Sequence, residues 1–103
     1  MKRLTLIMDE QLKQDAADLF RSMKQIQGFT FSRTEGHGAA SERSALLSDR
    51  DRVVGYTPHA RVEMLLEDHD VDGVLAALSK SRIGLNENSI YWVTAVERFG
   101  RLE

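Results

Sequence analysis

The sequence predicts an α+β domain in which a strand–helix–strand unit occurs twice. Four short segments alternate apolar and polar residues, and an amphipathic helical pattern separates the two segments of each pair. A polar, glycine-flanked stretch at about residues 36–58, with no sustained hydrophobic period, separates the two halves. Two such units side by side form a ferredoxin-like split βαβ plan (βαββαβ), a four-stranded antiparallel sheet with two helices on one face.

The first unit begins with a strand over Lys2–Met8, where apolar residues recur with a period of two. Asp9 is suited to cap the following helix, because its carboxylate can accept hydrogen bonds from the free N–H groups of the first turn. The helix is predicted to run to about Lys24, and Gly28 provides a left-handed stop. Alternation resumes over Phe29–Thr34, the second strand. The helix places its apolar residues in one stripe, namely Leu12, Ala16, Leu19, Phe20 and Met23.

The second unit repeats this order after the polar stretch. Alternation predicts a strand over Ala60–Glu67, and the acidic residues that follow favour the start of a helix that ends near Ser81. A last strand is predicted over Ile90–Glu97, before a short charged tail, Arg98–Glu103. The buried stripe of this helix is expected to be Val71, Val74, Leu75 and Leu78.

The sheet face opposite the helices is also predicted to carry apolar side chains. By alternation we expect Ile7, Leu65, Tyr91 and Val93 there. A contiguous apolar face of this kind usually marks an interaction surface. The sequence therefore favours a homo-oligomer.

Composition limits the classes of function. The 103 residues, 42% hydrophobic and 29% charged, are typical of a single globular domain over residues 1–103. The net charge of −2 argues against a general nucleic-acid binder, and the absence of cysteine excludes disulfides and thiolate chemistry. The segment before Asp9 is too short for a signal-peptide core or a membrane span. We expect a cytoplasmic protein without direct membrane insertion.

Catalysis is the class that the residues support least. The sequence has no cysteine nucleophile, no serine at a strand-to-helix elbow and no HExxH motif. His59 and Glu63 fall on the same face of a strand by parity, but two such residues do not define an acid–base site. We therefore expect that the protein is not an enzyme.

A divalent metal site is a separate hypothesis. Histidine and carboxylate ligands suit zinc, nickel or copper(II), and the chain has His37, His59 and His69 with several acidic residues nearby. These histidines do not fall at the spacing of a helical or clustered site. His37, at the base of the long polar stretch, is the best single candidate.

Three short motifs occur in order along the chain. Arg33–His37 reads Arg-Thr-Glu-Gly-His, Pro58–Met64 opens the second unit, and Arg82–Gly84 follows the second predicted helix just before an aromatic strand. Their order and spacing resemble the PII signal-transduction superfamily. In that superfamily an arginine-x-x-glycine-histidine segment begins the long T-loop, and an arginine-x-glycine B-loop follows the second helix.

The resemblance implies a homotrimer whose sheets face inward, with an adenine nucleotide or another anion bound in clefts between subunits. It also implies a T-loop that docks on a partner such as a membrane transporter or an efflux component. Carried over by position, the cleft residues would be Gly36, His37, Arg82, Gly84, Arg98 and Arg101. The loop residues expected to contact the partner are Arg43, Leu46, Leu47, Arg50 and Arg52.

The chain departs from the superfamily pattern at several positions. Thr34 and Glu35 stand where PII proteins have a glutamine and a lysine, and Ser89 stands in the place of the B-loop lysine. We therefore expect a divergent PII-like protein, of the type associated with heavy-metal efflux, and not classical nitrogen sensing. One alternative is a metal-binding or metal-tolerance trimer, since the CutA proteins share this plan. The arginines have a plainer interpretation too, as surface ion pairs with Glu97 and Glu103.

Overall fold

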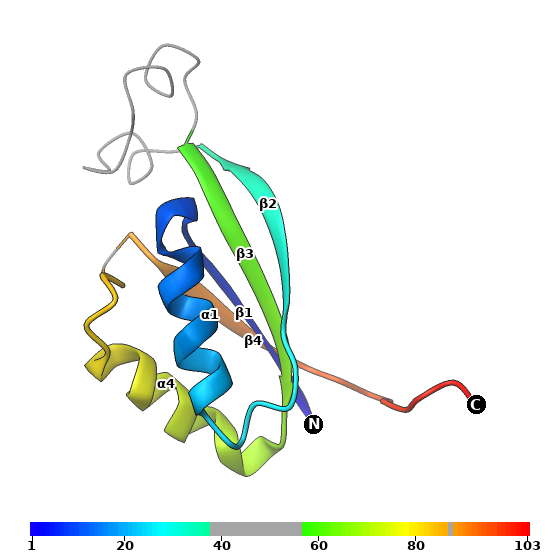
Figure 1. Cartoon of the computed structure of the whole chain (residues 1–103). Helices are drawn as coiled ribbons and strands as arrows, with labels where there is room; N and C mark the ends of the chain where they lie inside the picture. Colours follow the sequence, from blue (N-terminus) through cyan, green and yellow to red (C-terminus); the bar gives the residue numbers. More distant parts are fainter. Residues whose placement is uncertain (38–56, 87) are drawn as a thin grey trace.

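The computed structural model describes residues 1–37, 57–86 and 88–103. The strands form one antiparallel sheet in the order β2-β3-β1-β4, and both helices cover the same face (Figure 1). The predicted α+β architecture is therefore confirmed. In chain order the elements are β1 (Lys2–Asp9), the 3-10 turn η1 (Glu10–Leu12), α1 (Lys13–Ser22), β2 (Thr30–Gly36), β3 (Thr57–Leu66), the 3-10 turn η2 (Asp68–Asp70), α4 (Val71–Lys80) and β4 (Ile90–Ala95).

The core lies between the helices and one face of the two central strands. Leu4 pairs with Met64 and Leu6 with Val62, so that their side chains point to the same side of the sheet. All four are almost fully buried. Alternation along β1 and β3 thus generates the apolar face that the helices cover. The other buried core residues are Met8, Ala16, Phe20, Met23, Ile26, Ala60, Leu66, Val74 and Leu78.

The start and the end of α1 differ from the prediction. Asp9 is the last residue of β1, and its side chain makes no capping hydrogen bond. Its carboxylate is instead buried on the face of the sheet away from the helices, where Oδ1 lies 3.8 Å from Nε2 of His59. The helix ends at Ser22, and Gly28 is not a left-handed stop, because Gly84 is the glycine with a positive φ among those described.

The open face, the side of the sheet without helices, differs from the prediction in β4. Tyr91 and Val93 pair with core leucines of β1 and therefore share the helix-covered face. Ile90 and Trp92 lie on the open face in their place. The prediction was wrong because β4 is apolar at successive positions, so that alternation alone does not fix its parity. Ile7 and Leu65 lie on the open face, as predicted.

A row of paired residues crosses the open face near the middle of the sheet. Thr30 lies opposite Glu63, Glu63 opposite Thr5, and Thr5 opposite Trp92. Thr5 is fully buried between its neighbours, and its Oγ1 has no hydrogen-bond partner within the described residues. A buried hydroxyl without a partner costs about 1–3 kcal/mol.

An aromatic cluster attaches the start of β2 to α1. The ring of Phe29 meets the fully buried ring of Phe20 edge-on at a centroid distance of 5.3 Å, and meets Phe31 at 5.7 Å. Such edge-to-face pairs stabilise by about 0.5–1.5 kcal/mol beyond the burial of their area. The cluster fixes the position of the chain just before β2.

The opposite end of β2 continues past the end of β1. Glu35 pairs with Pro58 and Gly36 with Thr57, whereas the last pair between β1 and β3 is Asp9 with His59. The predicted loop at about 36–58 is therefore bounded by strand residues, and positions 38–56 lie outside the described residues. Within the described part of the chain, no helix is long and apolar enough to cross a membrane.

The unpaired hydroxyl of Thr5 leads to a stability prediction. Thr5→Val keeps the shape of the side chain and removes the group without a partner, so we expect the free energy of unfolding to rise by about 1 kcal/mol. Urea denaturation followed by circular dichroism measures this change. Thr5→Ser, which keeps the hydroxyl and loses the methyl group, should lower stability. A less stable Thr5→Val protein would mean that the hydroxyl is bonded in solution.

Candidate functional site

The structure places the base of the long polar stretch at one end of β2. Gly36 is buried at the end of the strand, and His37 is exposed, with Nε2 3.3 Å from Oε2 of Glu35. His37 has a further contact, so it is not a free ligand. The described residues contain no group of three or more potential metal-binding side chains.

The segment after α4 lies at the opposite edge of the sheet. Gly84 adopts φ +107°, and a Cβ built on it would lie 3.2 Å from Cδ2 of Leu12, which follows β1. Leu12 follows β1, which is two inter-strand spacings of about 4.8 Å from β2, roughly 10 Å in all. Gly84 and Gly36 thus belong to segments that lead to different edge strands, β4 and β2.

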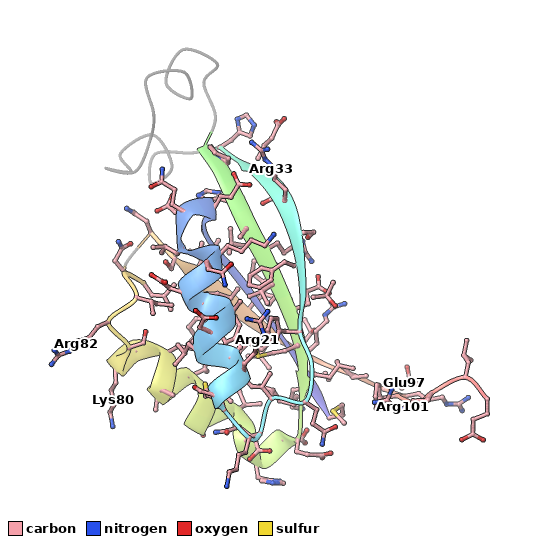
Figure 2. The ribbon with its side chains drawn as sticks, in the orientation of Figure 1. Arg21, Arg33, Lys80, Arg82, Glu97 and Arg101 are labelled. Atoms are coloured by element: carbon pink, nitrogen blue, oxygen red, sulfur yellow. The ribbon has the colours of Figure 1, made fainter. Side chains whose placement is uncertain are left out.

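Arg82 points away from the body of the domain (Figure 2). It follows the C-terminal end of α4 by two residues, where the helix dipole favours a positive charge. No ion pair of Arg82 is found among the described residues. This position gives Arg82 a simple role at the helix end and leaves its guanidinium available to a ligand or a second subunit.

Three backbone N–H groups of the turn that leads into β4 form hydrogen bonds within the turn. The N–H of Asn88 donates to Oδ1 of Asn86 at 2.8 Å, and the N–H of Ser89 donates to the carbonyl of Asn86 at 2.9 Å. The N–H of Asn86 in turn reaches Oγ of Ser89 at 3.4 Å. These three N–H groups are occupied, so this turn does not offer them to a phosphate as the B-loop comparison would require.

The C-terminal tail, residues 96–103, leaves the sheet at the end far from Gly36 and extends away from the body (Figure 1). The N–H of Val96 still donates to the carbonyl of Met1 at 3.1 Å. Arg98 and Arg101 are exposed. Among the described residues, neither arginine forms an ion pair with Glu97 or Glu103, the pairs that would make them simple surface residues. Because a strand rises about 3.4 Å per residue, the seven residues of β2 separate this end from the loop base by about 20 Å.

A pocket of about 890 Å³ lies where the tail passes the start of β2 and the end of β3. Pairing between β2 and β3 stops at Thr30 and Glu63, so the outer edge of the last β3 residues is not covered by a strand. The approach to β2, Gln27–Phe29, forms one wall, and Phe99–Arg101 forms another. Of the six predicted cleft residues, only Arg101 lines this pocket.

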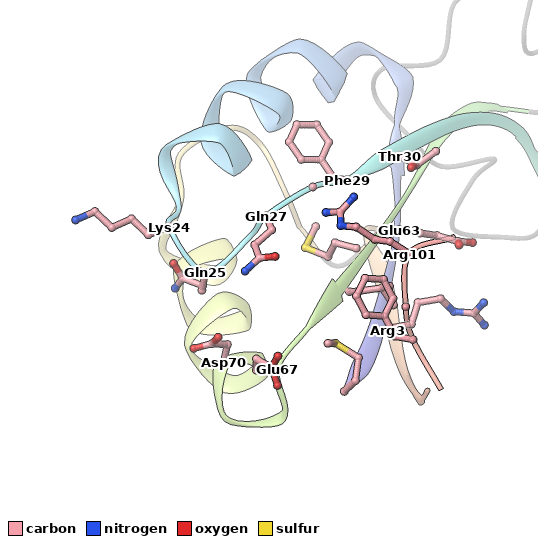
Figure 3. Close-up of a pocket in the computed structure, with 16 residues that line it drawn as sticks. Arg3, Lys24, Gln25, Gln27, Phe29, Thr30, Glu63, Glu67, Asp70 and Arg101 are labelled. Atoms are coloured by element: carbon pink, nitrogen blue, oxygen red, sulfur yellow. The ribbon is translucent and has the colours of Figure 1, made fainter. Parts of the chain in front are cut away.

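The charges in the pocket divide into two ends. Arg101 points from the tail toward Phe29 at the start of β2, and Lys24 points away from the other labelled side chains (Figure 3). Glu67 and Asp70 lie together at the other end (Figure 3). Met1 also lines the pocket, and its ammonium donates a hydrogen bond to the carboxylate of Asp68 at 2.6 Å. This bond lowers the pKa of the Asp68 carboxyl.

Glu63 belongs to the end of the pocket that holds Arg101, and its charge is already compensated. Arg61, two residues earlier on the same face of β3, approaches the Glu63 carboxylate to 2.7 Å. Arg3, also on the open face, adds a second positive charge to the lining. This end is therefore positive and partly aromatic, which suits a small organic anion.

A search among curated proteins found no match to this chain. The family model described as "Protein of unknown function (DUF3240)" matches residues 1–103. The chain belongs to this family. A crystal structure of a DUF3240 family protein from Shewanella baltica OS155 is similar, with a TM-score of 0.75 and 20% identity over 99% of this chain and 96% of that one. At this identity the similarity supports the fold alone.

For this DUF3240 chain, sequence reasoning missed most of the pocket. It indicated Arg101 but not Arg3, Glu63 or Phe29 as neighbours, because only the register and the path of the tail bring them together. The residues predicted to contact a partner, Arg43, Leu46, Leu47, Arg50 and Arg52, lie outside the described residues.

The conformation of Gly84 predicts a local requirement for glycine. Gly84→Ala should lower the free energy of unfolding by about 1–3 kcal/mol, because its positive φ is strained for alanine and the new Cβ would press on Leu12. Gly73→Ala is the matched control, since Gly73 lies inside α4 with no atom within 4 Å of a built Cβ. That change should raise stability by about 0.5–1 kcal/mol. Equal effects of the two changes in urea denaturation would contradict this explanation.

Proposed function

We propose that this chain is a PII-like regulatory protein of the cytoplasm, which binds a small organic anion such as an adenine nucleotide and acts on a partner protein. The observation that carries the proposal is the position of Arg101, which points from the tail toward Phe29 within a pocket that Glu63 and Arg3 also line (Figure 3). The PII-like order of motifs around the two units supports the same function.

The chemistry of the pocket fits such a ligand. The guanidinium of Arg101 can donate paired hydrogen bonds to a phosphate or a carboxylate, and Arg3 adds positive charge. Phe29 and the exposed Phe99 give the lining apolar atoms, and Thr30 and Glu63 supply polar atoms. A volume of about 890 Å³ lies within the range of small-molecule sites.

A homotrimer is part of the proposal. The open face carries Ile90 and Trp92, which are 53% and 37% exposed in the single chain, beside Ile7 and Leu65. Apolar side chains on an uncovered sheet face favour burial against other copies. Assembly through neighbouring edges would also bring the loop base of one subunit near the segment after α4 of the next.

The partner in this proposal is a membrane transporter or an efflux component, which binds through the segment between β2 and β3. The support is the motif order, together with the placement of Gly36 and Thr57 as a paired base from which this segment leaves the sheet. A ligand that contacts the ends of such a segment can bias its conformation.

The nucleotide proposal predicts a calorimetric result. Titration with ATP, ADP and AMP should give heat for at least one of them, and Arg101→Ala should weaken binding about tenfold or more, because hydrogen bonds to charged groups are lost. Lys80→Ala, which removes a positive charge from the exposed end of α4, is the control. Arg82→Ala tests the cleft between subunits, since a loss equal to that of Arg101→Ala would place Arg82 at the ligand as well. No heat and no thermal shift with any of the three nucleotides would contradict the proposal.

The trimer proposal predicts the effect of a charge on the open face. Sedimentation velocity should give a trimeric mass for the wild-type protein, and Ile90→Asp should give a folded monomer, because a buried carboxylate without a partner disfavours the interface. Ile90 is more than half exposed in the single chain, so the fold should survive the change. A monomeric wild-type protein at micromolar concentration would rule out this assembly.

A further inference from the structure

The contact between Arg61 and Glu63 is one-sided. Nε and Nη2 of Arg61 lie 2.8 and 2.7 Å from the same carboxylate oxygen, Oε1 of Glu63. Within the described residues, no hydrogen bond to Oε2 is found. One oxygen of this carboxylate is thus held by the guanidinium, and the other keeps its capacity to accept a hydrogen bond.

The guanidinium itself is held in place by an aromatic ring. Cζ of Arg61 lies 5.6 Å from the ring centroid of Trp92 on β4, a distance at which a cation and an indole attract each other. Arg61 and Glu63 are two residues apart on one strand, so both side chains lie on the open face, where β1 separates them from Trp92. The ring limits the freedom of Arg61, and Arg61 in turn limits the freedom of Glu63.

Glu63 also lines the pocket, at the end that contains Thr30 and Arg101 (Figure 3). We infer that Glu63 determines which anion the pocket accepts, and that Arg61 is its positioning residue. The ligand class is a small anion that carries a hydrogen-bond donor. Its anionic group binds Arg101, and its N–H donates to Oε2 of Glu63. This inference rests on the proposed function and specifies the ligand of the same pocket.

The physical reason for selectivity is the cost of a mismatch. A ligand with an N–H opposite Oε2 forms a charge-assisted hydrogen bond, whereas a carbonyl at that position places two acceptors together. A site built to pair with a polar group rejects the analogue that lacks it much more strongly than an apolar site does. ATP and ITP form a suitable pair of probes, because they differ at the 6-amino and 6-oxo groups of the base.

The test is the ratio of the ATP and ITP dissociation constants, measured by calorimetry on the full chain. We expect the wild-type protein to prefer ATP about tenfold or more. Glu63→Gln should bring the ratio close to one, since its amide offers a donor as well as an acceptor. Arg61→Ala should lower the ratio, because it removes the contact that positions Glu63. Arg61→Lys, which keeps the charge without the two-nitrogen contact, should give an intermediate ratio.

Arg33→Ala is the control, because Arg33 forms a looser arginine–carboxylate pair with Glu10, at 3.7 Å, and neither residue lines the pocket. It should leave the ratio unchanged. Trp92 is the single tryptophan, so its fluorescence reports the contact with Arg61 and should shift in Arg61→Ala but not in Arg33→Ala. Equal affinity of the wild-type protein for ATP and ITP, or a ratio that survives both Glu63→Gln and Arg61→Ala, would overturn the inference alone. Binding of neither nucleotide would overturn it together with the proposed function.

Discussion

The pairing of β1 with β3 is the constraint on which the rest of the structure depends. It places Leu4 beside Met64 and Leu6 beside Val62 under the helices, and so it also places Thr5 beside Glu63 on the open face. A shift by one residue would exchange the two faces and bury charged side chains in the core. The apolar core therefore fixes the register, and the register determines which polar residues meet on the other side.

Local patterns in the sequence were sufficient for the architecture but not for contacts between distant segments. Periodicity located the four strands and both helices, because apolar side chains must face one core. It failed at β4, where Tyr91 and Val93 were assigned to the wrong face. Apolar residues at successive positions do not indicate which alternate side chains face the core. It also failed at Asp9, whose carboxylate faces His59 on another strand and does not cap the helix. Both errors concern partners about fifty or more positions away in the chain.

The candidate site shows the same division between local and long-range information. The motif Arg82–Gly84 is local and was found in the sequence, whereas the glycine requirement at Gly84 comes partly from a close approach to Leu12, which is distant in the chain. The pocket depends on where β2 begins and on the path of the tail past Glu63, and neither follows from spacing. The predicted cleft residues occupy three separate places in one chain. A common role for them would therefore require other copies of the chain, whereas the pocket around Arg101 is already present in the single chain.

The extension of β3 beyond β1 has a consequence for solubility. The last pair between β1 and β3 is Asp9 with His59, and the residue before His59 on β3 is Pro58. Pro58 pairs with Glu35 of β2 and has no N–H to offer a further strand. Exposed strand edges are templates for uncontrolled pairing between molecules, and proline at an edge is one of the devices that prevent it. The ribbon formed by β2 and β3 can therefore project from the sheet without inviting aggregation along that side.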